Sequence, residues 1–559
     1  MGDWLMPHYF TSSANNTTTT SLMRQTLLLL VVATVCTALT AQTRYLGEVF
    51  ADVTVDAPMQ YQNNVSVLPA ILSGGQNPPS QVPDFFQAYY PTNDTATNRP
   101  AVILNTTGSY FPQLVGGGLF GTLQDSAVVN VARRFARMGY VAFVATYRQG
   151  WIPTSMQVDE RTGSLLIASY RGLQDMRSMT RFIRNNADDY GVNGDAIMAM
   201  GFGTGAYNVY NNNFLDDPSE VNVLPKFISS MGQPYLIPQA FGDPDGLMQA
   251  QLNIPQNVGA DSRVQFSAAI GGAMGDTTWV DGNANEAPIV ALHSINDRNA
   301  PFAAGDVFVP ISPTASLFVI NVAGPRATID KANRVGVNSE LDAVNSVLIS
   351  AGDFLTLRSE ALVDVDFTTR DNIETTLSVE NLYPFVSDPA LGLANRYNYI
   401  DSAQLDPIVR GFNMQTGETL TTAQRLAFER ISNPNITSPV RANMVIDTIM
   451  GFVAPRAFVA LDLGTAQDVA MAIDVVDIQP TDVDFEVFPN PVKERAVLRV
   501  RDGVEMQLVA LYDAQGRRVA HRVISGNQYG LERGSLPAGH YTLMVQTTEG
   551  ALSAQVLFQ

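Results

Sequence analysis

The chain is poor in cysteine, histidine and long apolar runs, and each shortage excludes a class of protein. It has 559 residues and one cysteine, Cys36. That residue lies within residues 1–41, so no disulfide or cysteine-ligated metal is expected in the rest of the chain. Outside the leader no run of about 18 apolar residues occurs, so we expect no membrane-spanning helix. No cofactor or metal site is predicted, because a zinc site here would need several carboxylates, which is an uncommon ligand set.

Charged residues are also scarce, at 16% of the chain, and the formal net charge is −19. Nucleic acids and anionic lipids would repel such a chain, so neither is expected as its main partner. Almost all basic residues are arginines, since only Lys226, Lys331 and Lys493 are lysines. This bias is typical of protein interfaces and suits a chain that binds a protein partner or itself. A saline habitat or a GC-rich genome gives the same bias.

Residues 1–41 have the features of a leader with a secretory signal. Arg24 precedes the apolar run 27–35, and small residues follow as far as Ala41. The run is too short to stay in a bilayer as a spanning helix. Translation starts at Met1 or Met23, which the sequence leaves open.

From residue 101 onward, apolar strand-like blocks alternate with segments of helical spacing. Residues 101–104, 140–146 and 195–200 are predicted strands, and 128–138 and 172–187 are predicted helices. This order predicts an α/β domain over residues 42–463, with a mostly parallel sheet covered by helices on both faces. Insertions are expected near 215–261 and 340–440, and a last helix from residue 440 should end before Pro455.

A second domain is predicted at the C-terminus. Residues 464–484 are expected to be a linker, and short alternating strands with glycine turns over residues 485–559 predict a small all-β sandwich. Three ordered motifs lie in this domain: Phe-Pro-Asn-Pro-Val at 488–492, Leu-Tyr-Asp-Ala-Gln-Gly-Arg at 511–517 and Leu-Pro-Ala-Gly-His-Tyr at 536–541.

These motifs resemble the type A C-terminal sorting domain of type IX secretion. The resemblance implies an interaction with the type IX machinery, passage through the inner and outer membranes, and a location at the cell surface or outside the cell. The residues that carry it are Pro489, Asn490, Pro491, Gly516, Leu536, Pro537, Gly539 and Tyr541.

The large domain resembles the α/β-hydrolase fold of secreted esterases and lipases. Residues 102–108, 133–140 and 141–150 match its first strands and helix, with a Tyr-Arg pair at Tyr147 and Arg148. The family carries its nucleophile in Gly-x-Ser-x-Gly, on a tight turn from strand to helix. Residues 201–205 are Gly-Phe-Gly-Thr-Gly here, so Gly203 occupies the serine position, and glycine has no atom that can attack an ester.

The other catalytic positions are altered as well. Asp297 matches the acid position, and the base histidine of the family should follow it in the chain. The four histidines are His8, His293, His521 and His540, so none lies between Asp297 and the end of the large domain. The family's oxyanion loop, His-Gly-Gly-Gly, is replaced by Asn105, Thr106, Thr107 and Gly108, which removes glycines that let the backbone approach a substrate.

The sequence is therefore consistent with two functions. In the first, the chain is an exported, catalytically inactive α/β-hydrolase-like protein that acts as a structural or binding component at the cell surface or outside the cell, and self-assembly is one form of that role. No catalytic residue is then expected, and Gly203, Asp297 and the loop 105–108 are vestiges. In the alternative, the chain is a secreted carboxylesterase or lipase-like hydrolase with a non-standard site, for which Ser109, Thr204 and Ser294 are available hydroxyls.

Overall fold

The structure is a computed structural model. It describes residues 44–113, 118–312, 315–351, 353, 355–356, 366–369, 374–377, 379–386, 394–400, 402–474, 485–512, 518–547 and 550–559. The predicted leader and the sorting residue Gly516 lie outside these ranges.

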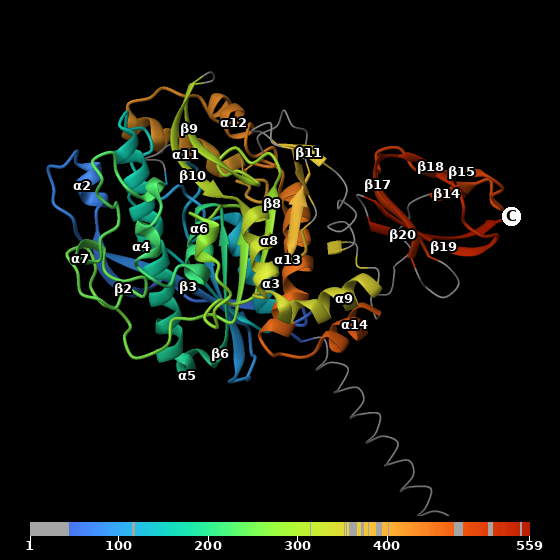
Figure 1. The fold of residues 1–559 in the computed structure, drawn as a ribbon, viewed down its shortest axis with the longest axis horizontal. Helices are drawn as coiled ribbons and strands as arrows, with labels where there is room; N and C mark the ends of the chain where they lie inside the picture. The colour runs from blue at the N-terminus through green and yellow to red at the C-terminus, as the bar shows by residue number, and fades with distance from the viewer. Residues whose placement is uncertain are drawn as a thin grey trace, which may run out of the picture.

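A nine-stranded sheet forms the centre of the large domain (Figure 1). Its strand order is β1-β3-β5-β4-β6-β7-β8-β13, and β2 pairs with β3. The pairs from β5 to β13 are parallel, and β1, β2 and β5 each run antiparallel to β3. The strands are β1 (Val53–Val55), β2 (Met59–Ser66), β3 (Ser80–Pro91), β4 (Arg99–Asn105), β5 (Val141–Ala145), β6 (Val192–Phe202), β7 (Phe266–Ile270), β8 (Ile289–Ser294) and β13 (Leu382–Phe385).

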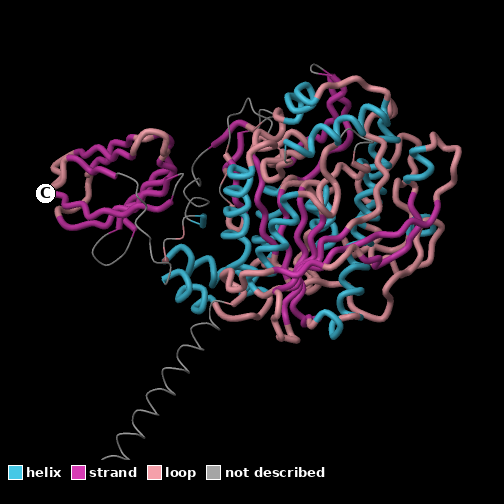
Figure 2. The backbone as a smooth tube through the Cα atoms, turned by 180° about the vertical axis from the view of Figure 1, so that it is seen from behind, coloured by secondary structure: helices cyan, strands magenta, loops and turns pink. Residues whose placement is uncertain are grey.

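Helices cover both faces of this sheet (Figure 2). The helices of the described residues are α2 (Leu68–Leu72), α3 (Ser126–Met138), α4 (Val158–Asn185), α5 (Ala187–Tyr190), α6 (Thr204–Phe214), α7 (Pro238–Phe241), α8 (Pro325–Val335), α9 (Asp342–Ser350), α11 (Ser402–Thr416), α12 (Thr422–Glu429), α13 (Pro439–Ala460) and α14 (Ala466–Asp474). Side chains of α4, α6 and α8 pack on one face and those of α3, α9, α13 and α14 on the other. Successive side chains of a strand point to opposite faces of the sheet. On β4, Ile103 therefore lies in the first core, and Val102 and Leu104 lie in the second. The predicted α/β-hydrolase-like fold class is confirmed.

Two small antiparallel pairs lie outside the central sheet: β9 (Ala304–Ser312) with β10 (Ala315–Ala323), and β11 (Asp366–Thr368) with β12 (Glu374–Thr376). The C-terminal domain has two antiparallel sheets over one core, which confirms a small all-β domain. Their strands are β14 (Phe485–Phe488), β15 (Arg495–Val500), β16 (Met506–Tyr512), β17 (Arg518–Gly526), β18 (Gln528–Glu532), β19 (Gly539–Thr547) and β20 (Gly550–Phe558).

The expected boundaries of segments differ from the structure in three places. Residues 340–440 are not one insertion, because β13 within them pairs with β8 and closes the central sheet. The expected linker 464–484 contains α14, which packs on the large domain through the buried Val469. Helix α13 continues through Pro455, because the residues on both sides, including Val453 and Ala457, are fully buried.

Helix α13 is also the only helix of the described residues that is long and apolar enough to cross a membrane. More than half of its most apolar window, 56%, is buried inside the protein. Its apolar side chains thus belong to the second core of the large domain.

A buried ion pair fastens α4 to the sheet. Arg148, just after β5, donates from Nε to Oδ1 of Asp175 on α4 at 2.8 Å, and its backbone N–H donates to Oδ2 at 2.7 Å. Both side chains are fully buried. The same guanidinium donates to the carbonyls of Val65 and Leu252, so one side chain joins β2, α4 and the first insertion.

We expect Arg148→Met to lower the free energy of unfolding by about 3–5 kcal/mol, because it leaves the buried Asp175 carboxylate without its cation. Urea unfolding of the purified chain measures this. The control is Arg263→Met, since the Arg263–Asp261 pair is about half exposed and such pairs contribute about 0–1 kcal/mol. Equal, small losses for both variants would contradict the assignment.

Candidate functional site

The candidate site lies at the carboxyl edge of the parallel strands. Asn105 ends β4, Gly203 follows β6, and Asp297 follows β8. Tyr397 comes after β13, the last strand of the sheet in chain order. Because parallel strands end at the same edge, this is where ligands bind in open α/β sheets.

Gly203 occupies a sharp turn between β6 and α6. Its backbone has φ 55° and ψ −113°, and its N–H donates to the carbonyl of Ile270 at 2.9 Å. The flanking glycines are required by packing: a β-carbon on Gly201 would lie 2.1 Å from the carbonyl oxygen of Gly205, and one on Gly205 would lie 2.5 Å from that of Asn105. The tight elbow of the hydrolase pattern is therefore kept, with no side chain at its tip.

The side chain of Thr107 fills the space in front of that tip. A β-carbon on residue 203 would lie 2.3 Å from Thr107 Oγ1 and 3.0 Å from Thr107 Cβ. The same point is 3.6 Å from the hydroxyl of Tyr397. A serine at position 203 therefore does not fit unless Thr107 moves.

The rest of the loop 105–108 takes part in packing. Asn105 is buried, donates to the carbonyl of Ala145 at 3.2 Å and accepts from Asn208 at 3.2 Å. The carbonyl of Thr106 accepts the Tyr147 hydroxyl at 2.9 Å. A β-carbon on Gly108 would lie 2.9 Å from the Cα of Gly121. These contacts fix the loop against its neighbours.

Asp297 is a buried carboxylate held by its own turn. Its Oδ1 accepts the backbone N–H groups of Asn299 at 2.7 Å and Ala300 at 3.0 Å. Its Oδ2 lies 3.7 Å from Nε2 of His293, four residues earlier, and that nitrogen lies 3.3 Å from the carbonyl oxygen of Ala300. The imidazole beside the acid thus comes from β8 itself, not from a segment later in the chain.

Tyr397 is a site residue that the sequence analysis missed. It is buried, its ring centroid lies 5.0 Å from that of Phe202, and its hydroxyl hydrogen-bonds with the backbone of Gly203. Burial raises the pKa of this hydroxyl, and the negative charges of Asp297 and Asp125 raise it further. Tyr397 thus follows Asp297 in the chain, as the family's base does, but it is a phenol that keeps its proton at neutral pH. The tyrosine- and asparagine-rich segment 395–400 was the only signal in the sequence.

The segment that carries Tyr397 is fastened to the start of α3. The side-chain oxygen of Asn398 accepts the N–H of Ala127 at 2.9 Å, and the N–H of Tyr399 donates to the Ser126 hydroxyl at 2.7 Å. From the other side, Asn433 donates to the carbonyl of Asn398 at 2.7 Å. These bonds hold Tyr397 over Gly203.

The other candidate hydroxyls are occupied or lie apart from His293. Thr204 Oγ1 lies 2.9 Å from the Tyr147 hydroxyl oxygen, and Ser294 is buried in β8 beside His293, where neighbouring side chains point to opposite faces. Ser109 is exposed, with φ 56°. Among the residues that the structure describes, no three His, Cys, Asp or Glu side chains gather as a metal site would require.

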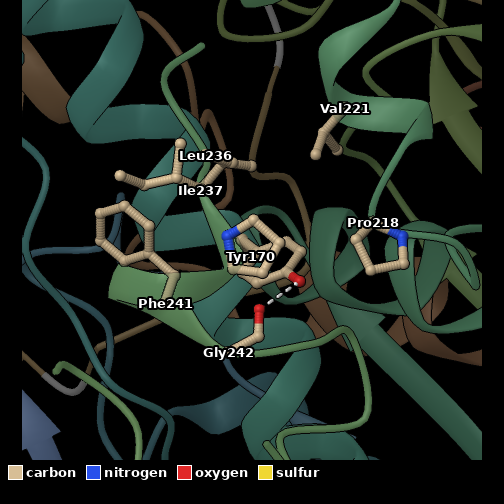
Figure 3. A pocket seen from close by; sticks show the side chains of 8 residues that line it. Tyr170, Pro218, Val221, Leu236, Ile237, Phe241 and Gly242 are labelled. Carbon is tan, nitrogen blue, oxygen red and sulfur yellow. Dashed lines mark hydrogen bonds between the residues drawn. The ribbon is translucent and has the colours of Figure 1, made fainter. Parts of the chain in front are cut away.

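Two hollows of the large domain lie away from the elbow. One is lined by apolar residues of α4 and the first insertion, among them Tyr170, Leu236 and Phe241 (Figure 3). The Tyr170 hydroxyl donates to the carbonyl of Gly242, another residue of the lining, at 3.0 Å. A second hollow lies around Arg456. Neither is lined by a residue of the elbow.

Comparison with known proteins identifies the C-terminal domain. Residues 486–559 match the family described as secretion system C-terminal sorting domain. The chain therefore carries a type IX sorting tail, which implies an exported protein that interacts with the type IX machinery. No curated protein matches the chain in sequence.

Solved structures similar to the large domain include esterases. Esterase 2 of Thermogutta terrifontis phosphoramylated by tabun is 12% identical, with 65% of this chain and 94% of that chain covered and a TM-score of 0.31. Its propionate-bound form is 12% identical, with coverages of 60% and 90% and a TM-score of 0.28. Esterase B of Lactobacillus rhamnosis is 14% identical, with coverages of 49% and 76% and a TM-score of 0.25. At these scores the likeness says nothing about activity, and the fold assignment rests on the sheet itself.

We expect Gly203→Ser to lower the free energy of unfolding by about 1–3 kcal/mol, because the new side chain meets Thr107 and takes a strained backbone conformation. Combining it with Thr107→Ala should give a favourable coupling energy of about 1 kcal/mol or more in a double-mutant cycle. The control is Gly74→Ser. Gly74 also has a positive φ, of 62°, but no atom lies within 4 Å of a β-carbon added there, so this variant has the backbone strain without the steric contact. A coupling energy near zero would contradict the contact.

Asp125, at the start of α3, should make stability depend on pH. Burial raises its pKa to about 7, whereas an unfolded aspartate titrates near pH 4. The folded state therefore holds a proton that the unfolded chain loses, so this group lowers stability as pH rises from about 4 to 7.

The Asp125→Asn variant has no group at this position that titrates between pH 4 and pH 8. We expect the free energy of unfolding of the wild type, measured against the Asn variant, to fall between pH 5 and pH 8. Urea unfolding at four pH values in this range measures it. A difference that stays constant with pH would show that Asp125 is charged throughout.

Proposed function

We propose that the large domain is an exported α/β-hydrolase-like body that does not cleave esters and acts as a binding or structural component at the cell surface or outside the cell. The observation that supports this most strongly is the Thr107 side chain in the space where residue 203 would carry a nucleophile. Export itself follows from the sorting tail.

Ester cleavage by this fold needs an attacking oxygen, a base that takes its proton and donors for the oxyanion. Gly203 supplies no oxygen, Tyr397 stands near it with a pKa raised by burial, and the loop 105–108 is engaged in packing. A general base works best when its pKa lies near the working pH. Loss of one triad member alone lowers kcat by several orders of magnitude.

The hydroxyl of Thr107 is the oxygen closest to the vacant position, so it is the strongest competitor to this proposal. Its Oγ1 and the Tyr397 hydroxyl both lie within 4 Å of the point where a β-carbon on residue 203 would stand. A threonine nucleophile needs an adjacent base, and the Tyr397 phenol keeps its proton at neutral pH. His293 is engaged with Asp297 and Ala300 on its own strand and turn.

Without ester cleavage, the fold serves as a scaffold that presents its surface segments to a binding partner. The first insertion, 215–261, is anchored by Arg148 and by Gln174, which donates to the carbonyls of Phe241 and Asp243 at 2.7 and 2.8 Å. Segments displayed on a rigid scaffold are where binding residues concentrate. Low charge and scarce lysine favour a protein partner.

We expect the purified chain to form no covalent adduct with a fluorophosphonate probe and to show no turnover of p-nitrophenyl acetate or butyrate. Gly203→Ser should not restore turnover, because no base is in place. Intact mass spectrometry and absorbance assays measure both, with an active serine esterase as the positive control. A one-to-one adduct on the folded chain, mapped to Thr107, Ser109, Thr204 or Ser294, would establish the alternative of a hydrolase with a non-standard site.

A further inference from the structure

Several residues of the sorting motifs hold the C-terminal domain together. Val492 is fully buried and donates to the carbonyl of Leu557 at 2.7 Å. Asn490 accepts the N–H of Leu557 at 3.0 Å, so the first motif is tied to the last strand. Tyr541 is buried against Phe558, and its hydroxyl donates to the carbonyl of Pro537 at 2.9 Å. Their place in the motifs is therefore accounted for by the contacts that they make within the folded domain.

Phe488, in the first of the same motifs, has a side chain that packs little within the domain. Its side chain is 76% exposed at the end of β14. Its register partner on β15 is Val497, which is 46% exposed, and directly opposed residues of an antiparallel pair have adjacent side chains. The alternate residues of β15, Leu498 among them, are buried in the core. An aromatic ring and a valine thus lie together on the outer face of the sheet β14-β15-β18.

The surroundings of this pair are charged but balanced. Glu486 lies opposite Arg499 in the register, and Arg495 lies 3.9 Å from Glu532. Gly530 on β18 lies opposite Val497 in the register, and a β-carbon there would lie 2.5 Å from the Arg495 guanidinium. The outer face is therefore an apolar pair, Phe488 and Val497, within a rim of equal numbers of acidic and basic side chains.

We propose that this outer face is the surface by which the type IX machinery recognises the domain, and that a protein component of that machinery takes the Phe488 ring into an apolar pocket. A buried aromatic anchor within a polar rim is the usual centre of a protein interface. This inference concerns export and does not depend on whether the large domain is catalytic.

Two other occupants fit the face less well. Anionic lipid headgroups are attracted by clusters of basic residues, and the balanced rim offers none. A stable homodimer buries about 800 Å² on each partner, whereas one aromatic side chain buries about 150–250 Å². The patch suits a brief contact in which one ring enters a partner's pocket.

The test uses the full chain produced in a bacterium with type IX secretion. We expect Phe488→Ser with Val497→Ser to lower the fraction found in the medium and on the cell surface at least tenfold, with the chain retained in the periplasm. Phe488→Trp should be exported. The matched control is Val519→Ser, which removes an apolar side chain of 36% exposure from β17 in the other sheet and should leave export unchanged.

Misfolding is separated from lost recognition in two ways. The thermal unfolding midpoint of the purified double variant should equal that of the wild type. A photoreactive benzoylphenylalanine placed at Phe488 should crosslink to an outer-membrane protein in producing cells, and one placed at Val519 should not. Normal export of the double variant, or crosslinks at Phe488 only to lipid or to another copy of the chain, would overturn the proposal.

Discussion

The contact between Thr107 and the backbone of Gly203 is the constraint on which the rest of the site depends. The elbow brings the chain close to the loop after β4, and the two segments fit because one has a glycine where the other has a threonine. Both residues are half-buried, and the volume that a nucleophile on residue 203 would use is taken by the Thr107 side chain. The Tyr397 hydroxyl lies 3.6 Å from the same point, and its ring packs on Phe202.

The glycines of the elbow motif are retained for a reason unrelated to chemistry. Gly201 and Gly205 lie where added β-carbons would meet backbone atoms at 2.1 and 2.5 Å. Any chain that turns from β6 into α6 beside β4 needs small residues there. The outer glycines of the Gly-x-Gly-x-Gly pattern therefore follow from the packing of the elbow, and only the middle residue bears on catalysis.

The sequence was sufficient for β4, β5 and β6 and for the position of Gly203, because apolar periodicity and a tight glycine turn are local properties. It was not sufficient for Thr107 and Tyr397, which meet Gly203 only because three strands end at one edge. Helix α13 was expected to end before Pro455, and burial on both sides overrode that local preference. β13 was overlooked because residues 340–440 were expected to be one insertion, and its pairing with β8 is a long-range contact.

The measurement that tests the central claim most directly is a crystal structure of the chain soaked with a short-chain phosphonate ester. The account predicts electron density for Thr107 Oγ1 packed against Gly203, with Tyr397 over it and no phosphonate at the elbow. A Thr107 side chain rotated away from Gly203, with the phosphonate in the space it leaves, would contradict the account.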